Sequence, residues 1–222
     1  MARERTLSHD EARRFYDAFG ARQDTQAFYE DPPNRDLAAH CELESARRVL
    51  ELGCGTGRFA AGLLESELPA DATYHAIDQS ETMVSLARQR LAPYASRVTV
   101  TCSDGTLKLP TESGSGDRFL STYVLDLLSR DDIAELLREA HRVLAPAGLA
   151  GVTSLTFGRD PLGRVVSGLW GVVHRLSPRR VGGCRPLDLV PFFAGPQWRI
   201  EHEATHRIRG LTSQVVVARR RP

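Results

Sequence analysis

The sequence predicts an α/β fold in which helices cover both faces of a mostly parallel, doubly wound sheet. Short apolar and β-branched runs alternate with segments of helical periodicity, which is the pattern of successive β-α-β units. The first apolar run passes into a glycine-rich loop and then a helical segment, an arrangement typical of nucleotide-like ligand sites. At 222 residues the chain can bury one full core, so we expect a single domain.

Strands and helices are expected in regular alternation. Five strands are expected at residues 48–52, 73–77, 97–101, 117–122 and 148–155. Helices are expected at residues 57–66, 80–91 and 130–143. Ser129 and Asp132 have the spacing of a capping box and mark the start of the last of these helices. Two further strands, at 197–203 and 213–219, are expected to form a terminal hairpin.

The N-terminal region is expected to begin with a capped helix. Ser8 and Glu11 form a capping box, and the helix that follows ends at Gly20. Residues 24–33 are aromatic and end in two prolines, which predicts a loop that the prolines stop.

Residues 157–195 contain an apolar stripe followed by a basic cluster. The stripe has helical spacing and comprises Val165, Val166, Leu169, Trp170, Val173 and Leu176. The basic cluster comprises Arg179, Arg180 and Arg185, and a second helix is expected at 186–194 with Pro186 in its first turn. We interpret the region as an apolar pocket wall with a basic rim. The alternative is that the stripe is ordinary core and the arginines are solvated.

The glycine-rich loop carries the strongest functional signal. Glu51 precedes Gly53, Gly55 and Gly57, which alternate strictly, so a ligand can approach the main chain closely. A dinucleotide fingerprint has the spacing G-x-G-x-x-G, and Arg58 occupies the position of its third glycine. The loop therefore argues against NAD or FAD.

A second strand ending in a carboxylate follows at the distance that a cofactor site requires. Residues 74–78 end in Asp78, which is placed to accept hydrogen bonds from both hydroxyls of a ribose. The loop E-x-G-x-G-x-G together with this acid resembles the class I S-adenosylmethionine-dependent methyltransferases. The resemblance covers residues 47–156, including a fourth-strand segment at 117–128, and departs mildly at Ala147, where the usual motif has glycine.

The resemblance implies a fold, a cofactor and a division of the chain. It implies a seven-stranded sheet with one antiparallel strand, and S-adenosylmethionine (SAM) as cofactor with S-adenosylhomocysteine as product. It divides the chain into an N-terminal helical lid at 1–46, a cofactor-binding core at 47–156, an acceptor-side insertion at 157–195 and the C-terminal hairpin at 196–222.

The resemblance also names cofactor-binding residues. Asp78 would hold the ribose, Met83 would pack near the adenine, and Asp104 would accept from the adenine amine. Tyr16 and Tyr29 would contact the cofactor from the lid, although Tyr16 could equally pack the first helix onto the sheet. The remaining positions implied are Glu51, Gly53, Cys54, Gly55, Thr56, Gly57, Gln79, Ser103, Gly105, Ser121 and Thr122.

Three residues are candidates for a catalytic role. A methyl group on a sulfonium is already activated, so transfer proceeds by in-line displacement and depends mainly on alignment. A phenol or alcohol acceptor would also gain from a base. Asp126 follows the fourth strand with Tyr123 beside it, although Asp126 could instead cap or pair with Arg130. His174 is a further candidate base, with a structural role as the alternative.

Composition excludes several function classes. The formal net charge is +1, which does not favour a nucleic-acid partner. The four cysteines lack C-x-x-C spacing, so we expect free thiols and no metal site. With no signal peptide and no long apolar run, the chain is expected to be cytoplasmic, without stable membrane insertion, and a monomer or homodimer.

The leading functional hypothesis is methyl transfer from SAM to a small, hydrophobic acceptor. One alternative is methylation of a lipid headgroup or quinone at a membrane surface, favoured by the amphipathic insertion and by three terminal arginines, 219–221. Another is a SAM-binding regulator without turnover. Only turnover separates an enzyme from a binding protein of this kind.

Overall fold

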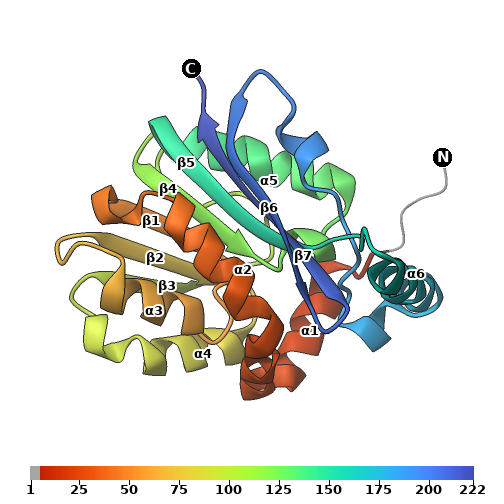
Figure 1. Ribbon diagram of the computed structural model, residues 1–222. Coiled ribbons are helices and arrows are strands. Elements are labelled where there is room, and N and C mark those ends of the chain that lie inside the picture. Colours follow the sequence, from red (N-terminus) through yellow and green to blue (C-terminus); the bar gives the residue numbers. More distant parts are fainter. Residues whose placement is uncertain (1–5) are drawn as a thin grey trace.

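A seven-stranded sheet forms the centre of the molecule in a computed structural model that describes residues 6–222 (Figure 1). Its strand order is β3-β2-β1-β4-β5-β7-β6, and β7 runs antiparallel to both of its neighbours. The strands are β1 Arg48–Leu52, β2 Thr73–Asp78, β3 Val98–Cys102, β4 Gly116–Thr122, β5 Leu144–Leu155, β6 Trp198–Ile208 and β7 Leu211–Arg220. The predicted seven-stranded, mostly parallel sheet is therefore confirmed.

Six α-helices are found within residues 6–222, joined in places by short 3-10 turns. They are α1 His9–Phe19, α2 Ala27–His40, α3 Arg58–Ser66, α4 Glu81–Arg90, α5 Arg130–Val143 and α6 Pro161–Leu176. Both predicted capping boxes are present, because Ser8 caps α1 with Glu11 and Ser129 caps α5 with Asp132. Within the same residues, no helix combines the length and the apolar character needed to cross a bilayer.

The sheet is buried on both faces, and every residue of β1 after Arg48 is buried. Val49 and its neighbours on one face pack with α2, α3 and α4, while Leu50 and its neighbours on the other face pack with α5 and residues 187–193. Figure 1 shows α2 and α3 on the near side of the sheet and α5 behind it. The doubly wound prediction is thus confirmed by two separate clusters of buried side chains.

The strand order places a ligand site at the carboxyl end of β1. From β1 the chain proceeds through β2 to β3 on one side and returns to β4 on the other side of β1. Crossover connections diverge at such a point and leave a crevice between the loops that follow the strands. The glycine-rich loop after β1 lies at that crevice.

One prediction about the N-terminal region is wrong. Residues 27–33 belong to α2, which continues through Pro32 and Pro33 to His40 instead of ending as a loop. A proline inside a helix removes the N–H that would bond to the carbonyl four residues earlier. For Pro33 that carbonyl belongs to Tyr29, and the Tyr123 hydroxyl lies 3.5 Å from it. A tertiary contact therefore gives this carbonyl the partner that the helix cannot provide.

The predicted helix at 186–194 is also wrong. Only a short 3-10 turn, Val190–Phe193, is present there. The preceding backbone donors bond outside the segment, since Leu187 N donates to Leu155 O (2.9 Å) and Leu189 N donates to Gln214 Oε1 (2.8 Å). These contacts tie residues 187–189 to β5 and β7. Three strands are longer than predicted, namely β5 and the two hairpin strands β6 and β7.

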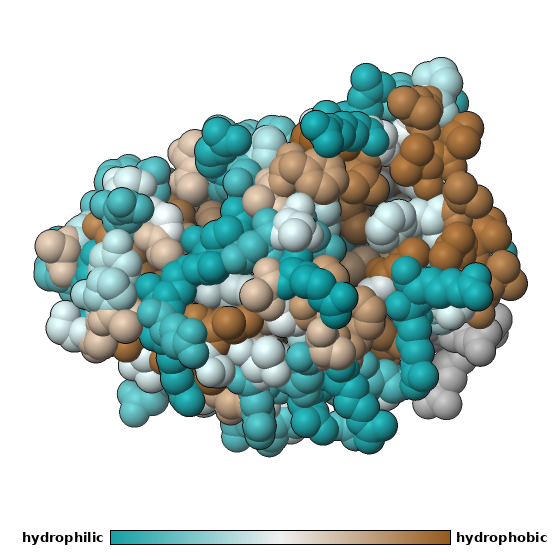
Figure 2. Space-filling view, turned by 90° about the horizontal axis from the view of Figure 1, so that it is seen from below, coloured by the Kyte–Doolittle hydropathy of each residue, from teal (hydrophilic) through white to brown (hydrophobic). Residues whose placement is uncertain are grey.

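Helix α6 presents two different faces. Val166, Trp170 and Val173 face inward and are half-buried, whereas a second row of apolar residues faces solvent. The outer row comprises Leu162, Val165, Leu169, Val172 and Leu176, each more than half exposed. Figure 2 shows apolar side chains gathered on the side of the molecule where α6 lies. The predicted apolar stripe therefore divides between core and surface.

Candidate functional site

An open cavity lies at the carboxyl ends of β1, β2 and β4. Its floor is formed by the loops that follow these strands, and its cover is formed by α1, the turn Gly20–Gln26 and the start of α2. The predicted residues that line it are Tyr16, Tyr29, Gly53, Gly55, Asp78, Gln79, Met83, Ser103, Gly105, Thr122 and Tyr123.

Two glycines of the loop have no room for a side chain. Gly53 and Gly55 have φ values of +78° and +52°, in the left-handed region that favours glycine. A Cβ at Gly53 would lie 2.1 Å from Val124 Cγ2, and a Cβ at Gly55 would lie 2.5 Å from Gln23 Oε1. The main chain of this loop therefore borders the cavity directly, which is the geometry of a cradle for a ligand.

Asp78 is held at the end of β2 by two backbone donors. Its Oδ2 accepts from Gly55 N (2.9 Å) and its Oδ1 accepts from Ser80 N (2.9 Å). Burial raises the pKa of this carboxyl, although the backbone donors oppose the shift. Each oxygen of an ionised carboxylate has a second lone pair, so Asp78 can still accept from two vicinal hydroxyls.

Gln23 provides a polar atom without a protein partner. Its Oε1 is buried beside Gly55, and no hydrogen bond to it is found within residues 6–222. Buried polar atoms are nearly always satisfied in folded proteins, so an orphaned acceptor at a cavity wall indicates a donor on the ligand. An ammonium or hydroxyl group of a bound molecule would meet this requirement.

An aromatic wall closes the side of the cavity opposite Asp78. The rings of Tyr29 and Tyr123 meet edge to face with their centroids 5.6 Å apart. The Tyr16 hydroxyl lies 3.8 Å from Cys184 Sγ, and Cys184 is one of the lining residues. Tyr123 adopts a φ of +56°, which is uncommon for a bulky side chain, so the surrounding contacts hold it in this conformation.

Comparison with known proteins agrees with this geometry. A family model described as a methyltransferase domain matches residues 49–148. A malonyl-(acyl-carrier protein) O-methyltransferase of Halorhodospira halophila is 33% identical over 184 residues, covering 79% of this chain and 59% of that protein. The fold, the cradle and the matching family model together decide the assignment. The chain belongs to the class I SAM-dependent methyltransferases.

Other relatives differ in the acceptors that their names state. A tRNA N(3)-methylcytidine methyltransferase of Drosophila melanogaster is 27% identical, covering 63% of this chain and 46% of that protein. The (4+2)-cyclase SpnF has a similar solved structure, with a TM-score of 0.73, 17% identity, and coverage of 97% of this chain and 98% of that chain. The chain spans only about half the length of the two curated relatives, the Halorhodospira halophila and Drosophila melanogaster methyltransferases. The similarity therefore identifies the family and leaves the acceptor open.

SAM is the cofactor of this methyltransferase family, and the cavity fits it. The cradle of Gly53 and Gly55 could hold the methionine portion of SAM, and the lone pairs of Asp78 could accept from its ribose hydroxyls. The unpaired acceptor of Gln23 matches a cationic ammonium group. Met83, on α4, lines the cavity with an apolar side chain that could pack against the adenine.

Six of the predicted cofactor-binding residues do not line this cavity: Glu51, Cys54, Thr56, Gly57, Asp104 and Ser121. Glu51 is buried behind the loop, where Tyr74 Oη donates to it (3.0 Å) and burial raises its pKa to about 7. Asp104 is exposed and accepts from Thr106 N (2.9 Å) and Oγ1 (2.7 Å). The hydrogen bonds from Thr106 keep the pKa of Asp104 below its usual value.

The other four members of this group have structural partners. Thr56 Oγ1 donates to Asp24 Oδ1 (2.6 Å) and ties the loop to the N-terminal cover. Ser121 Oγ donates to Leu52 O (3.0 Å), Gly57 packs against α4, and Cys54 is buried beside the loop. All four cysteines are free, as predicted. Glu51, Cys54 and Thr56 line a smaller hollow that shares Gln23, Gly53 and Thr122 with this cavity, whereas Gly57 and Ser121 shape the loop without lining either hollow.

Two predicted catalytic residues are also placed away from the cavity. Asp126 is fully buried behind the aromatic wall, where Leu155 N lies 3.5 Å from its Oδ2, and burial raises its pKa to about 7. His174 Nε2 lies 3.1 Å from Gly183 O on the inner face of α6. The predictions that these side chains reach the acceptor are therefore not supported, and Tyr123 is the one candidate that lines the cavity.

The predicted basic rim is wrong as well. Arg179 Nη2 donates to Glu11 (2.7 Å) on the outside, and Arg185 is buried with Nη1 bonded to Leu128 O (2.6 Å). None of the three predicted arginines lines the cavity. Helix α6 supports the wall from behind, because Trp170 Nε1 donates to Cys184 O (2.9 Å).

One lining carboxylate was missed. Glu30 is only 6% exposed and lines the cavity from α2. Burial raises its pKa to about 7, and the Arg58 guanidinium, with Nη2 at 3.2 Å, opposes this shift. The sequence pattern predicts a loop for residues 27–33. Treating them as a helix next to the cavity would have made Glu30 a candidate for the cavity wall.

Proposed function

We propose that this methyltransferase transfers the methyl group of SAM to a small, largely apolar acceptor that carries no net negative charge. The observation that supports this is the composition of the acceptor side of the cavity. Tyr16, Tyr29, Tyr123 and Cys184 form it, and no lysine or arginine within residues 6–222 lines the cavity. A carboxylate or phosphate acceptor would enter such a wall without a cationic partner, at a high desolvation cost.

The protein's contribution to the reaction is alignment in a dry site. SAM supplies an activated methyl group on its sulfonium when it is bound. Gly53, Gly55, Asp78 and Gln23 would fix the cofactor, while the aromatic wall would fix the acceptor in line with the methyl group. Alignment of this kind can lower a barrier by about 7–11 kcal/mol.

The N-terminal cover is suited to act as a lid, as the sequence suggests. Hydrogen bonds join it to the core at separate points: His9 Nδ1 lies 2.5 Å from Gly105 O, and Ser80 Oγ donates to Asp17 Oδ1 (2.6 Å). Arg90 Nη2 donates to Asp24 Oδ2 (2.6 Å) at a third point. Such polar, partly exposed contacts can break without unfolding the sheet. The N-terminal cover would then open to admit SAM and close again to exclude water.

Glu30 would act as general base where the acceptor is a phenol or alcohol. Its pKa of about 7 lies near the working pH, where a base is most effective. It would accept the acceptor's hydroxyl proton as the oxygen–methyl bond forms and the sulfonium carbon–sulfur bond breaks. An amine acceptor present as the free base would not require this step at the moment of transfer.

Calorimetric titration with S-adenosylhomocysteine, compared with NAD, tests the cofactor half of the proposal. We expect micromolar binding of the former and none of the latter. The acceptor half is tested by incubating the chain with methyl-labelled SAM and a panel of uncharged phenols, amines and matched carboxylates. Labelling confined to the carboxylates would overturn the proposed acceptor class, and binding without any labelling would favour a regulator.

A lipid or quinone acceptor at a membrane surface is a second candidate, favoured by the outer face of α6. That face exposes five apolar side chains, and the same helix carries exposed Arg164 and Arg175 without an acidic residue. Apolar residues flanked by arginines suit adsorption to an anionic bilayer. Cosedimentation with anionic and neutral vesicles tests this, with Leu169→Ser/Leu176→Ser as the weakened variant and exposed Ala134→Ser as the control. Equal binding by the two variants would exclude α6 as the contact.

A further inference from the structure

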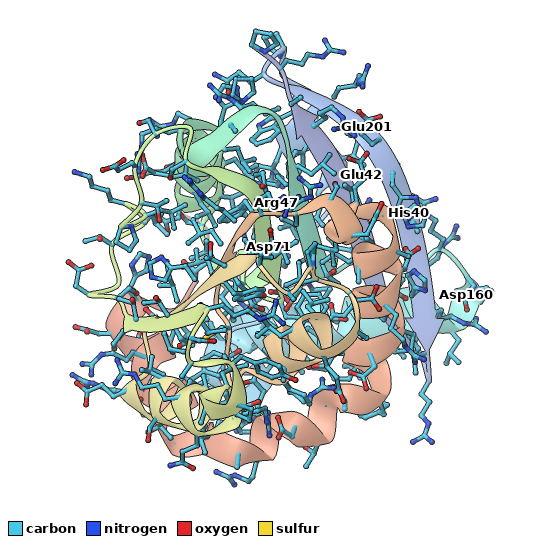
Figure 3. The ribbon with its side chains drawn as sticks, turned by 90° about the vertical axis from the view of Figure 1, so that its left-hand side faces the viewer. His40, Glu42, Arg47, Asp71, Asp160 and Glu201 are labelled. Carbon is cyan, nitrogen blue, oxygen red and sulfur yellow. The ribbon has the colours of Figure 1, made fainter. Side chains whose placement is uncertain are left out.

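Three histidines surround one carboxylate where α2 meets the edge strand β6. Asp36 and His40 are four residues apart on α2 and therefore share one helix face. His202 and His206 are four residues apart on β6 and share one face of the strand. Figure 3 shows His40 beside the long strands of the C-terminal hairpin. None of the four residues lines the cofactor cavity.

The spacing of the ligand atoms matches that of a small metal ion. Asp36 Oδ2 lies 3.0 Å from His202 Nε2, and Asp36 Oδ1 lies 3.2 Å from His40 Nδ1. One ligand atom from each of these three residues can be chosen so that all lie within 4.8 Å of one another. Ligands about 2.0–2.2 Å from a tetrahedral ion are about 3.3–3.6 Å apart, so the two contacts to Asp36 need to lengthen only slightly.

We propose that Asp36, His40 and His202 bind a divalent transition-metal ion such as Zn²⁺. Two imidazoles and one carboxylate form a ligand set that suits Zn²⁺ and neighbouring metals better than Mg²⁺ or Ca²⁺, which prefer oxygen ligands. The site uses no cysteine and draws its ligands from distant parts of the chain, so cysteine spacing could not indicate it.

His206 serves as a positioning residue for Asp36. Its Nε2 lies 2.9 Å from Asp36 Oδ2, the same oxygen that faces His202. A hydrogen bond to a ligating carboxylate fixes its orientation and usually affects metal affinity without direct coordination. The fourth position on the ion is then open to water.

Binding requires one local rearrangement. The rings of His40 and His202 are stacked, with centroids 3.5 Å apart and an interplanar angle of 4°. An ion must lie close to the plane of each imidazole that ligates it, and two parallel planes cannot both contain it. The His40 side chain is 44% exposed, so its ring can rotate out of the stack toward the ion, which breaks the contact of its Nδ1 with Asp36 O (2.9 Å).

The ion would fasten α2 to the edge of the sheet. Helix α2 carries Tyr29 and Glu30 at its cavity end and Asp36 and His40 at the end next to β6. A metal bridge would restrain the second end without entering the cavity. We therefore expect metal binding to stabilise the fold while leaving cofactor affinity unchanged.

Titration of the untagged, chelator-treated chain tests the site. Exposed Cys102 is replaced by serine throughout, because a free thiol would bind the probe metals. Zn²⁺ binding is measured by calorimetry, and Co²⁺ is used as a second probe because its visible absorption reports four-coordinate geometry. The variants are His202→Gln, His40→Gln and His206→Gln, and the control is His141→Gln, which replaces a partly buried histidine on α5 that lies outside the cluster.

We expect one equivalent of Zn²⁺ to bind and the melting temperature to rise with it. His202→Gln and His40→Gln should each weaken binding by at least about 10-fold, His206→Gln by about 10-fold, and His141→Gln by less than about twofold. S-adenosylhomocysteine affinity should be the same in all variants, which verifies that each is folded. Absence of saturable binding in the parent chain, or parent-like affinity in His202→Gln, would overturn the proposal.

Discussion

Gln23 occupies the space that any side chain at position 55 would need. Its Oε1 lies 2.5 Å from the position of a Cβ on Gly55, and the same oxygen is buried without a hydrogen-bond partner within residues 6–222. The N-terminal cover and the glycine loop are therefore in close contact at the cavity wall, through Gln23 and Gly55. This contact makes Gly55 sensitive for two separate reasons, backbone conformation and space.

Gly55→Ala should weaken S-adenosylhomocysteine binding by at least about 10-fold, because a left-handed φ strains alanine by about 1–3 kcal/mol and its Cβ displaces Gln23. The matched control is Gly62→Ala, on α3, where a Cβ would meet nothing within 4 Å. That control should keep full affinity and gain about 0.5–1 kcal/mol of stability as a helical alanine. Calorimetry and thermal melting measure both effects. Equal affinity in the two variants would contradict the proposed cradle.

Asp78→Ala should weaken S-adenosylhomocysteine binding by about 10²- to 10⁴-fold, because it removes two hydrogen bonds to a charged carboxylate that contribute about 1.5–3 kcal/mol each. Asp104→Ala is the informative comparison, since Asp104 is exposed and bonded to Thr106. It should change affinity by less than about threefold, on the scale of a surface hydrogen bond. A large loss in Asp104→Ala would restore the adenine contact that the sequence suggests.

Much of the sheet could be predicted because its signals are local. The capping boxes at Ser8 and Ser129 and the glycines after β1 act through neighbours in sequence, and all three features are present in the structure. The errors arise where a distant residue decides the conformation. Helix α2 continues through Pro33, and the Tyr29 carbonyl that loses its helical donor there faces the Tyr123 hydroxyl, 94 positions away in the sequence.

The composition of the cavity wall was harder to predict than its location. Asp126 follows the correct strand, but the 3-10 turn Leu125–Leu127 directs its side chain into the core. Arg185 is internal because its guanidinium satisfies the carbonyl of Leu128. Neither orientation leaves a sequence signal, since a buried acid and a buried arginine have the same residue types as their exposed counterparts. Glu30 was missed only because α2 was interpreted as a loop.

Asp126→Asn should make the fold less sensitive to rising pH. Burial raises the pKa of Asp126 to about 7 from its ordinary value of 3.8, so the folded chain favours the protonated form. The stability that this proton provides is fully present below about pH 4 and is lost as the pH rises through about 7. Asparagine stays neutral and can still accept from Leu155 N. The melting temperature of the variant relative to wild type should therefore increase between pH 5 and about pH 8.

The control for this measurement is Asp131→Asn, which changes the same charge at an exposed position of α5. Its melting temperature should follow the wild-type pH dependence. If both variants respond alike, net charge and not the buried carboxyl accounts for the effect.

Glu30→Gln should lower turnover with a hydroxyl acceptor by about 10²- to 10⁴-fold, the range that general-base catalysis contributes. The acidic limb of the pH–rate profile, expected near pH 7 from the raised pKa of Glu30, should disappear in this variant. Amine methylation should be much less affected, because a free amine needs no base. Asp126→Asn is the matched control, since it neutralises a second buried carboxyl with a similar pKa that does not line the cavity. Retention of the acidic limb in Glu30→Gln together with its loss in Asp126→Asn would reassign the base to Asp126.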